Sequence, residues 1–312
     1  MAEKSGRGED RMSAQYSLFF IQRFKGKVLF NVMMSEYTSL RIGGPADVMA
    51  FPQDEGDLKD LITFAVARDF PFHVIGGGTN LLVRDGGIRG IVINMCEGFR
   101  DMTWHDDRAV IGAGVRLSEI LAHCKDAGLS GLEFAAGIPG TLGGAVAMNA
   151  GAYGSEMKDV VEGVEVVSRK GQKLFLPKSE IRFSYRKAEL PASCAVIRAH
   201  MRFAKKSAEE VKARTAELRE RRRSTSAISL PNAGSIFKNP EGMFAGKLIE
   251  DAGLKGARSG GAEVSGAHAN CIVNSGGAHA RDVLNLMALI RDRVYSRGGV
   301  LLEPEIKVVG DD

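Results

Sequence analysis

The stretch from residue 131 to residue 154 constrains the fold more than any other part of this 312-residue chain, and it reads GLEFAAGIPGTLGGAVAMNAGAYG. It is rich in glycine and carries a single charged side chain, Glu133. A flexible linker would be polar, and this stretch is apolar. Glycine allows a backbone to come into very close contact with a neighbouring group. We therefore expect this segment to pack closely against something large and flat.

The segments on either side alternate between helical and strand-like patterns. Apolar residues at helical spacing predict a helix that includes Leu58 to Val66 and another from Leu117 to Ala127, ended by Gly128. Short apolar runs predict strands at residues 72–75, 91–93, 109–113, 164–167, 174–176 and 196–203. The alternation indicates a mixed fold of helices and strands.

The last third of the chain opens with a capping box, Ser207 to Glu210, which begins a highly charged helix running to Arg223. We interpret most of its charges as a solvated face between two domains. An amphipathic pattern over residues 283–294, followed by Gly298 and Gly299, predicts a further helix. Residues 300–309 predict a final strand.

Length and composition bound the class of protein. A chain of 312 residues with 44% hydrophobic and 26% charged residues suggests two or three globular domains. The net charge of +4 is too small to indicate a nucleic-acid partner, but it suits a small polyanionic ligand. No window reaches the roughly 18 apolar residues that a membrane span requires. Residues 1–15 resemble a disordered tail, and we expect a cytoplasmic protein.

The cysteines indicate a reducing compartment. They lie far apart, with no CxxC pair, and we interpret them as free thiols: Cys96, Cys124, Cys194 and Cys271. None of the histidines forms an HExxH pair, so we expect no metal site.

Several familiar motifs fail on inspection. The segment from Gly242 to Lys247 resembles a phosphate-binding loop, but it is one residue short and Leu248 stands where a Mg-binding hydroxyl is needed. No GxGxxG follows a strand at the spacing of a Rossmann dinucleotide site. Ser265 lacks the leading glycine of a nucleophile elbow.

Four other segments carry chemistry. They are VIGGGTNLLV at 74–83, GIPGT through NAGAYG at 137–154, FSYR at 183–186, and AGSIFKNP at 233–240, with EPE at 303–305 near the end. Glycines directly after a strand can turn their N–H groups toward an anion, and Thr79 and Asn80 add side-chain donors. A tight turn without a ligand explains the first segment equally well.

In this order and spacing, the segments resemble UDP-N-acetylenolpyruvoylglucosamine reductases from about Arg41 to Gly310. The resemblance implies an α+β fold, with an FAD-binding module of the vanillyl-alcohol-oxidase (PCMH) type. It implies a tail and lead-in helix over 1–30, the FAD module over 31–204 in two subdomains (31–98 and 99–204), a smaller α/β substrate domain over 205–300, and a terminal strand over 301–312 that returns to the FAD module.

The resemblance also implies an activity. Such enzymes reduce UDP-N-acetylglucosamine enolpyruvate to UDP-N-acetylmuramate with NADPH, through FAD, for peptidoglycan precursor synthesis. Residues 131–160 contain neither His nor Cys, which favours non-covalent FAD over the tethered flavin of many related oxidases. We expect a monomer. A flavin oxidase and a catalytically inactive nucleotide-binding protein are the alternatives.

Carried over motif by motif, the resemblance assigns roles to individual residues. Arg186 supplies a cation beside the substrate carboxylate, and Ser235 protonates one carbon after hydride reaches the other. Glu305 assists near that carboxylate, either charged or as the neutral acid. The FAD-binding positions are Gly76, Gly77, Gly78, Thr79, Asn80, Gly137, Ile138, Pro139, Gly140, Thr141, Gly143, Ala150, Gly151 and Gly154.

The substrate-binding assignments are less specific. Asn239 is expected to hold the UDP diphosphate together with Arg223 or Lys238, although both cations equally suit solvated surface positions. Tyr185 is expected to pack beside the active arginine. Only residues 187–194 separate the SYR motif from the next strand, which is too little for the tyrosine-bearing insertion of the longer family branch. The chain therefore resembles the shorter branch.

Overall fold

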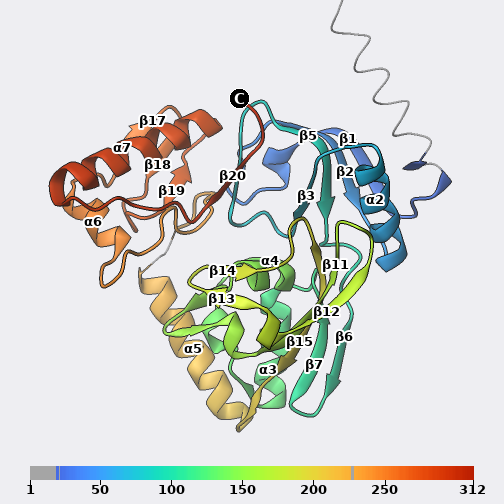
Figure 1. The fold of residues 1–312 in the computed structure, drawn as a ribbon. Coiled ribbons are helices and arrows are strands. Elements are labelled where there is room, and N and C mark those ends of the chain that lie inside the picture. Colours follow the sequence, from blue (N-terminus) through green and yellow to red (C-terminus); the bar gives the residue numbers. More distant parts are fainter. Residues whose placement is uncertain (1–18, 21, 226–227) are drawn as a thin grey trace, which may run out of the picture.

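The computed structural model describes residues 19–20, 22–225 and 228–312, so the tail expected over residues 1–15 lies outside the described part. Two larger sheets, of four and five strands, and a smaller C-terminal unit with a three-stranded sheet form the main parts of the molecule (Figure 1). The first strand, β1 (Lys27–Met33), begins before the domain boundary expected at residue 31.

The first sheet has the strand order β1-β2-β5-β3. It consists of β1, β2 (Pro45–Phe51), β5 (Ile88–Asn94) and β3 (Phe72–Ile75). Strand β2 runs parallel to β5, and β5 runs parallel to β3, because helix α2 (Glu55–Ala67) provides the crossover. Asp54 caps α2 by accepting a hydrogen bond from the Asp57 N–H at 2.9 Å. The predicted helix and both predicted strands here are confirmed.

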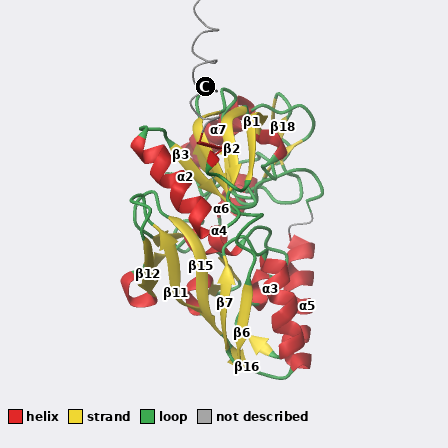
Figure 2. Cartoon of the chain, turned by 90° about the vertical axis from the view of Figure 1, so that its right-hand side faces the viewer, coloured by secondary structure: helices red, strands yellow, loops and turns green. Residues whose placement is uncertain are grey.

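The second sheet is antiparallel, with the order β12-β11-β15-β7-β6. Its strands are β12 (Lys173–Pro177), β11 (Val161–Val167), β15 (Ala195–Arg202), β7 (Arg108–Gly112) and β6 (Met102–His105). Figure 2 shows these strands side by side, with helices α3 (Leu117–Ala127) and α5 (Ala208–Thr225) beyond β7. Gly128 ends α3 in the left-handed conformation, and Glu210 donates its N–H to Ser207 Oγ at 3.2 Å, as the capping box predicts.

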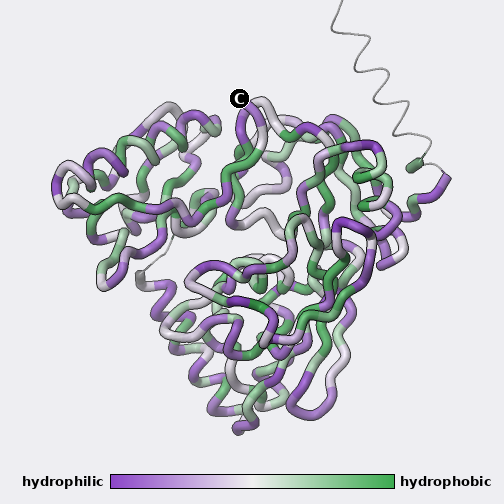
Figure 3. Tube along the Cα trace, in the orientation of Figure 1, coloured by the Kyte–Doolittle hydropathy of each residue, from purple (hydrophilic) through white to green (hydrophobic). Residues whose placement is uncertain are grey.

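The C-terminal unit packs helices against a small sheet. It contains α6 (Ala245–Asp251), β17 (Arg258–Ser259), β18 (Ala262–Val264), β19 (Ile272–Asn274) and α7 (Ala280–Gly298). Leu40, Ile42 and Leu82 belong to its hydrophobic core although they come from the first third of the chain. The C-terminal unit therefore packs against residues that lie between the strands of the first sheet in the sequence. Figure 3 shows that strands near the middle of the molecule are largely hydrophobic.

Two segments differ from the sequence-based expectation. Residues 142–147 form the short helix α4 (Leu142–Ala147) inside the glycine-rich stretch, where local propensity opposes a helix and burial of Leu142 and Val146 stabilises it. The expected strand over 300–309 is reduced to β20 (Lys307–Val309), parallel to β4 (Leu81–Val83). Pro304 has no N–H to continue a ladder, and it forms only an isolated bridge with Phe237.

An ionic cluster links the first sheet's helix to the second sheet. Glu165 on β11 has a side chain 15% exposed, and it lies 2.8 Å from Lys173 Nζ and 3.0 Å from His200 Nε2. Lys173 also reaches Glu55 of α2 at 3.1 Å. Burial opposes the charge on Glu165, but hydrogen bonds from Lys173 and His200 and the charge of Arg198 lower its pKa to about 2.

Glu165→Gln is expected to lower the free energy of unfolding by about 1–2 kcal/mol at pH 7, after allowance for solvent screening. Because the folded pKa lies below the unfolded one, this contribution is present above the unfolded pKa. It should disappear as the pH falls from about 5 toward 2. Denaturant unfolding across this range measures it. Glu162→Gln, which removes an exposed pair with Arg108, is the control and should cost little. A loss independent of pH would contradict this account.

Candidate active site

The glycine turn after β3 lies directly against the glycine-rich stretch. A side chain at Gly76 would collide with Thr141 Oγ1, and one at Gly140 would come within 2.9 Å of Thr79 Oγ1. Thr79 Oγ1 donates to the Pro139 carbonyl at 3.4 Å. Gly78 has φ +62°, which favours glycine. The first two motifs therefore form facing walls, about 60 residues apart in sequence.

These walls present donors without protein acceptors. Thr141 is 4% exposed, and its buried Oγ1 has no hydrogen-bond partner in the described part of the chain. Within the same residues, the N–H groups of Gly77, Gly78 and Thr79 also donate to no protein acceptor. A buried hydroxyl left without a partner is costly unless a ligand satisfies it. Donors on glycine walls suit the diphosphate of a dinucleotide such as FAD.

Asn149 connects the glycine-rich stretch to the SYR motif. It is fully buried, with φ +41°, and its Nδ2 donates to Glu156 Oε2 at 2.8 Å and to the Ser184 carbonyl at 3.0 Å. Gly151, two residues on, lies in the β9–β10 hairpin (Gly151–Ala152 and Ser155–Glu156). Sequence reasoning quoted Asn149 within a motif but gave it no role. A buried polar residue beside glycines was the available signal.

The other residues expected to bind FAD lie in different surroundings. Gly143 packs against strand β7's end, where a side chain would come 2.9 Å from Ala113 Cβ, so its glycine serves helix packing. Gly137, with φ +78°, faces Arg222, whose Cδ would be 2.9 Å from a side chain there. Ile138 and Ala150 are partly buried against the second sheet's core. Nothing lies within 4 Å of a side chain built at Gly154, whose φ is +84°.

Arg186 follows β13 (Arg182–Ser184) in the turn to β14 (Lys187–Glu189). Its φ of +59° is uncommon for a residue with a side chain. Nη1 donates to the Gly151 carbonyl at 2.7 Å, and Nε lies 3.0 Å from Glu305 Oε1. That second contact is an ion pair without hydrogen-bond alignment, since the buried Nε has no hydrogen-bond partner among the described residues. The guanidinium carbon lies 5.2 Å from the Tyr185 ring centroid.

Glu305 brings the C-terminal segment to the same place. Burial raises the pKa of its carboxyl, while the charges of Arg186 and Lys238 oppose that effect. Its N–H donates to the Ile236 carbonyl at 2.8 Å, which sets Glu305 beside the residue after Ser235. Asn80 Nδ2 donates to the Glu305 carbonyl at 3.2 Å. The structure thus brings together three motifs from distant parts of the chain.

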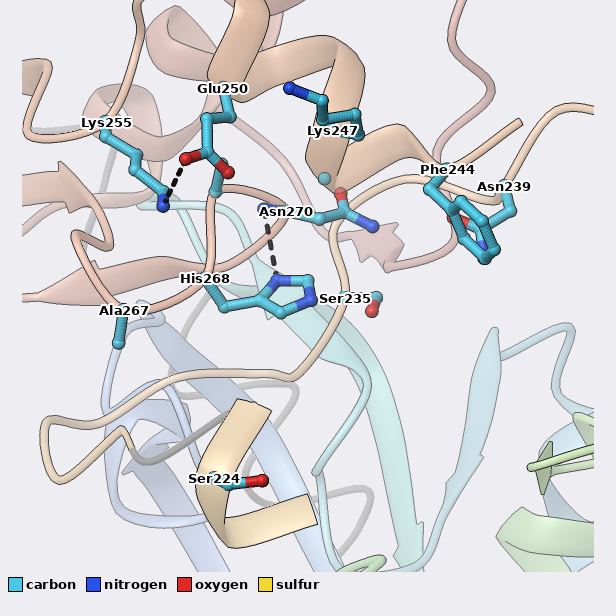
Figure 4. Close-up of a pocket in the computed structure, with 12 residues that line it drawn as sticks. Ser224, Ser235, Asn239, Phe244, Lys247, Glu250, Lys255, Ala267, His268 and Asn270 are labelled. Atoms are coloured by element: carbon cyan, nitrogen blue, oxygen red, sulfur yellow. Dashed lines mark hydrogen bonds and ion pairs between the residues drawn. The ribbon is translucent and has the colours of Figure 1, made fainter. Parts of the chain in front are cut away.

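Ser235 also opens onto a cavity of about 450 Å³ in the C-terminal unit (Figure 4). Its lining includes Ser235, Asn239, Phe244, Lys247, Lys255 and His268. Burial lowers the pKa of His268, and nearby cations add to the effect. The His268 Nδ1 accepts the Asn270 N–H at 3.3 Å, so the neutral ring carries its proton on Nε2, which points toward Ser235 in Figure 4. Sequence reasoning missed Lys247, Lys255 and His268.

The substrate-binding predictions have mixed support. Asn239 lines the cavity, and its Oδ1 accepts the Ala245 N–H at 3.0 Å. Lys238 pairs with Glu303. The side chain of Arg223 is 75% exposed and pairs with Glu220 on its own helix, so the structure does not bring it to the other residues. The neighbouring Arg222 lies toward the site instead.

Arg222 is a residue that sequence reasoning missed. It faces Gly137, and burial lowers the pKa of its guanidinium, with Arg186 adding to the effect. It lies seven residues after Thr215 and four after Leu218, both buried on α5. Helical spacing from these two buried residues therefore places Arg222, and not Arg223, on the buried face of α5.

No helix in the described ranges is long and apolar enough to cross a membrane.

Comparisons with known proteins agree with this geometry. The family of the "FAD binding domain" matches residues 46–175, and that of the "UDP-N-acetylenolpyruvoylglucosamine reductase, C-terminal domain" matches residues 226–309. UDP-N-acetylenolpyruvoylglucosamine reductases from Alkaliphilus oremlandii and Caldanaerobacter subterraneus are 44% and 46% identical, over 91% and 92% of this chain and 94% and 95% of theirs. The crystal structure of the Thermus caldophilus reductase is similar with a TM-score of 0.78 and 38% identity, covering 91% of this chain and 98% of that one.

Proposed function

This chain belongs to the UDP-N-acetylenolpyruvoylglucosamine reductase family, and from that membership we propose how its own residues perform the reaction. It is an FAD-dependent oxidoreductase of peptidoglycan precursor synthesis, and it uses NADPH. Its α+β fold combines a PCMH-type FAD-binding domain with the family's C-terminal domain.

The observation that carries the assignment of roles is the meeting of Arg186, Glu305 and the Ser235 segment. When bound, FAD would supply the hydride, which it would first take from NADPH. Arg186 places a fixed positive charge where the substrate carboxylate gains electron density. Ser235, held beside Glu305 by the Ile236 hydrogen bond, donates a proton to the carbon that does not receive hydride. Glu305 is the acid group that neighbours both, and burial raises the pKa of its carboxyl while Arg186 and Lys238 oppose that effect.

The glycine walls are proposed to hold FAD without a covalent bond. Thr141 Oγ1 and the N–H groups of Gly77, Gly78 and Thr79 supply donors for the diphosphate. Backbone at Gly76 and Gly140 permits close approach. The remaining residues proposed to line the cofactor are Asn80, Gly137, Ile138, Pro139, Gly143, Ala150, Gly151 and Gly154.

The cavity beside Ser235 is proposed to take the UDP portion of the substrate. Lys247 and Lys255 provide cations for the diphosphate, and Asn239 lines the same cavity. Lys238, next to Asn239 in the sequence, is proposed to assist them although it pairs with Glu303. Tyr185 supports Arg186 through its ring. The earlier expectation that Arg223 binds the diphosphate stays a prediction, with its exposed pair to Glu220 against it.

Phe244→Ala is expected to raise the KM for the UDP-sugar about tenfold and to leave kcat within a few-fold. Phe244 lines the cavity with 72% of its surface exposed, and stacking a base on an aromatic ring contributes roughly 1–3 kcal/mol. Steady-state kinetics measures both constants. Met243→Ala, next to it, exposed and outside the cavity lining, is the control. An unchanged KM would remove Phe244 from the substrate site.

The proposed domain boundaries are those expected from the sequence. The FAD module spans 31–204 and the substrate domain 205–300, and residues 301–312 return to the FAD module. We propose that the chain belongs to the shorter branch, and the short connection between β14 and β15, residues 190–194, supports this. We propose a cytoplasmic monomer.

One spectroscopic experiment tests the cofactor assignment. The purified protein should show oxidised-flavin absorbance that NADPH bleaches under argon, and acid precipitation should leave all FAD in the supernatant. The described flavin loops offer no His or Cys over residues 131–160 to form a tether. Flavin that stays with the precipitated chain would support an oxidase-like covalent flavin instead.

A further inference from the structure

Asn270 is a buried polar residue that the reaction described above does not use. It is 3% exposed, lines the cavity beside Ser235 and contacts the segment that follows Ser235. Its Oδ1 accepts the Phe237 N–H at 3.0 Å, and its Nδ2 donates to the Phe237 carbonyl at 2.7 Å. Its own carbonyl accepts the Ile236 N–H at 2.8 Å. Both residues that follow Ser235 are therefore held by Asn270.

The other edge of the same segment is held by Glu303–Glu305, which precede β20. The Ile236 carbonyl accepts the Glu305 N–H at 2.8 Å, and Lys238 donates its N–H to the Glu303 carbonyl at 2.9 Å. Between these two bonds stands Pro304, which has no N–H to give. The segment after Ser235 belongs to no sheet, forms an isolated bridge from Phe237 to Pro304, and is fixed between Glu303–Glu305 on one side and Asn270 on the other.

An asparagine amide can imitate a backbone peptide group, because it carries a donor and an acceptor side by side. We propose that Asn270 is the positioning residue for Ser235: its amide replaces a missing neighbouring strand and fixes the serine hydroxyl relative to Arg186 and Glu305. This inference rests on the proposed function of Ser235. Phe237 is fully buried, so removing the amide takes away the side-chain partner of both its N–H and its carbonyl.

The inference predicts a selective kinetic effect. Asn270→Ala should slow reoxidation of the reduced holoenzyme by UDP-N-acetylglucosamine enolpyruvate about 10–100-fold, the usual effect of a small misplacement. Reduction by NADPH should stay within threefold. Asn270→Ser, which keeps a short hydrogen-bonding side chain, should lose less, and it replaces the alanine variant if that one fails to fold.

The decisive comparison is a double variant in stopped-flow single turnovers. If Asn270 acts through Ser235, then Asn270→Ala combined with Ser235→Ala should reoxidise within threefold of Ser235→Ala alone. Asn274→Ala is the matched control, because its Nδ2 donates to the Leu40 carbonyl at 3.2 Å and leaves the Ser235 segment untouched. That control should affect both half-reactions less than threefold.

Two outcomes would overturn the inference: multiplicative losses in the double variant, or equal slowing of both half-reactions by Asn270→Ala. Either result would make Asn270 a general structural residue. A failure of the proposed function looks different. In that case Ser235→Ala alone would leave reoxidation unchanged, whatever Asn270→Ala does.

Discussion

Replacing Ser235 with alanine should slow reoxidation of the reduced enzyme by its enolpyruvyl substrate about 10²–10⁴-fold, the usual range for loss of a general acid. Reduction of the flavin by NADPH should stay within a few-fold of wild type, because that transfer needs no proton from the hydroxyl. The Ser235 side chain lines the cavity proposed for the UDP-sugar, beside His268, so its removal leaves the glycine walls intact. Stopped-flow absorbance follows each half-reaction separately.

Ser235→Cys serves as the companion variant. A thiol also carries a transferable proton, so part of the lost activity should return. Equal slowing of both half-reactions in Ser235→Ala would make the serine structural. The proton would then come from Glu305 or a bound water.

Arg186→Ala should reduce the rate of the same half-reaction about 10³-fold or more, since a fixed cation facing developing charge is worth this much in a buried site. The residue is held by the Gly151 carbonyl and by Glu305, with 22% of its side chain exposed. Arg186→Lys should recover only part of the activity, because an ammonium lacks the planar fork that matches a carboxylate. Rapid-mixing kinetics at saturating substrate separates this loss from weaker binding.

Arg182→Ala is the matched control for Arg186. Arg182 lies in the same hairpin, at its exposed outer strand β13, and makes no ion pair in the described structure. Its loss should leave both half-reactions unchanged. If Arg186→Ala retains activity, the guanidinium takes no part in the reaction and serves only to bind the Gly151 carbonyl.

Local structure was largely predictable because it depends on neighbouring residues. The helix ending at Gly128 and the capping box at Ser207 follow from side-chain chemistry within a few positions. Helix α4 was not predictable, because Leu142 and Val146 gain their stability from distant strands and not from local propensity. The C-terminal strand was predicted too long, because the apolar pattern over residues 300–309 takes no account of the missing N–H of Pro304.

The candidate site was likewise predictable only where local sequence determines it. Motif order indicated that Arg186, Ser235 and Glu305 act together, but only the packing of three distant segments shows how they meet. The choice of Arg223 over Arg222 depended on nearness to a motif, whereas helical phase decides which arginine faces Gly137. The cavity lysines were missed because Lys247 belonged to a failed phosphate-loop match and Lys255 to no motif.

The most direct test of the central claim is one anaerobic turnover of the wild-type enzyme. The flavin is first bleached with one equivalent of NADPH, and the reduced enzyme is then mixed with UDP-N-acetylglucosamine enolpyruvate under argon. The residues assigned here predict that oxidised-flavin absorbance returns without oxygen, with one UDP-N-acetylmuramate formed for each flavin. Absorbance that stays bleached until oxygen is admitted, with no muramate formed, would contradict the account and indicate an oxidase.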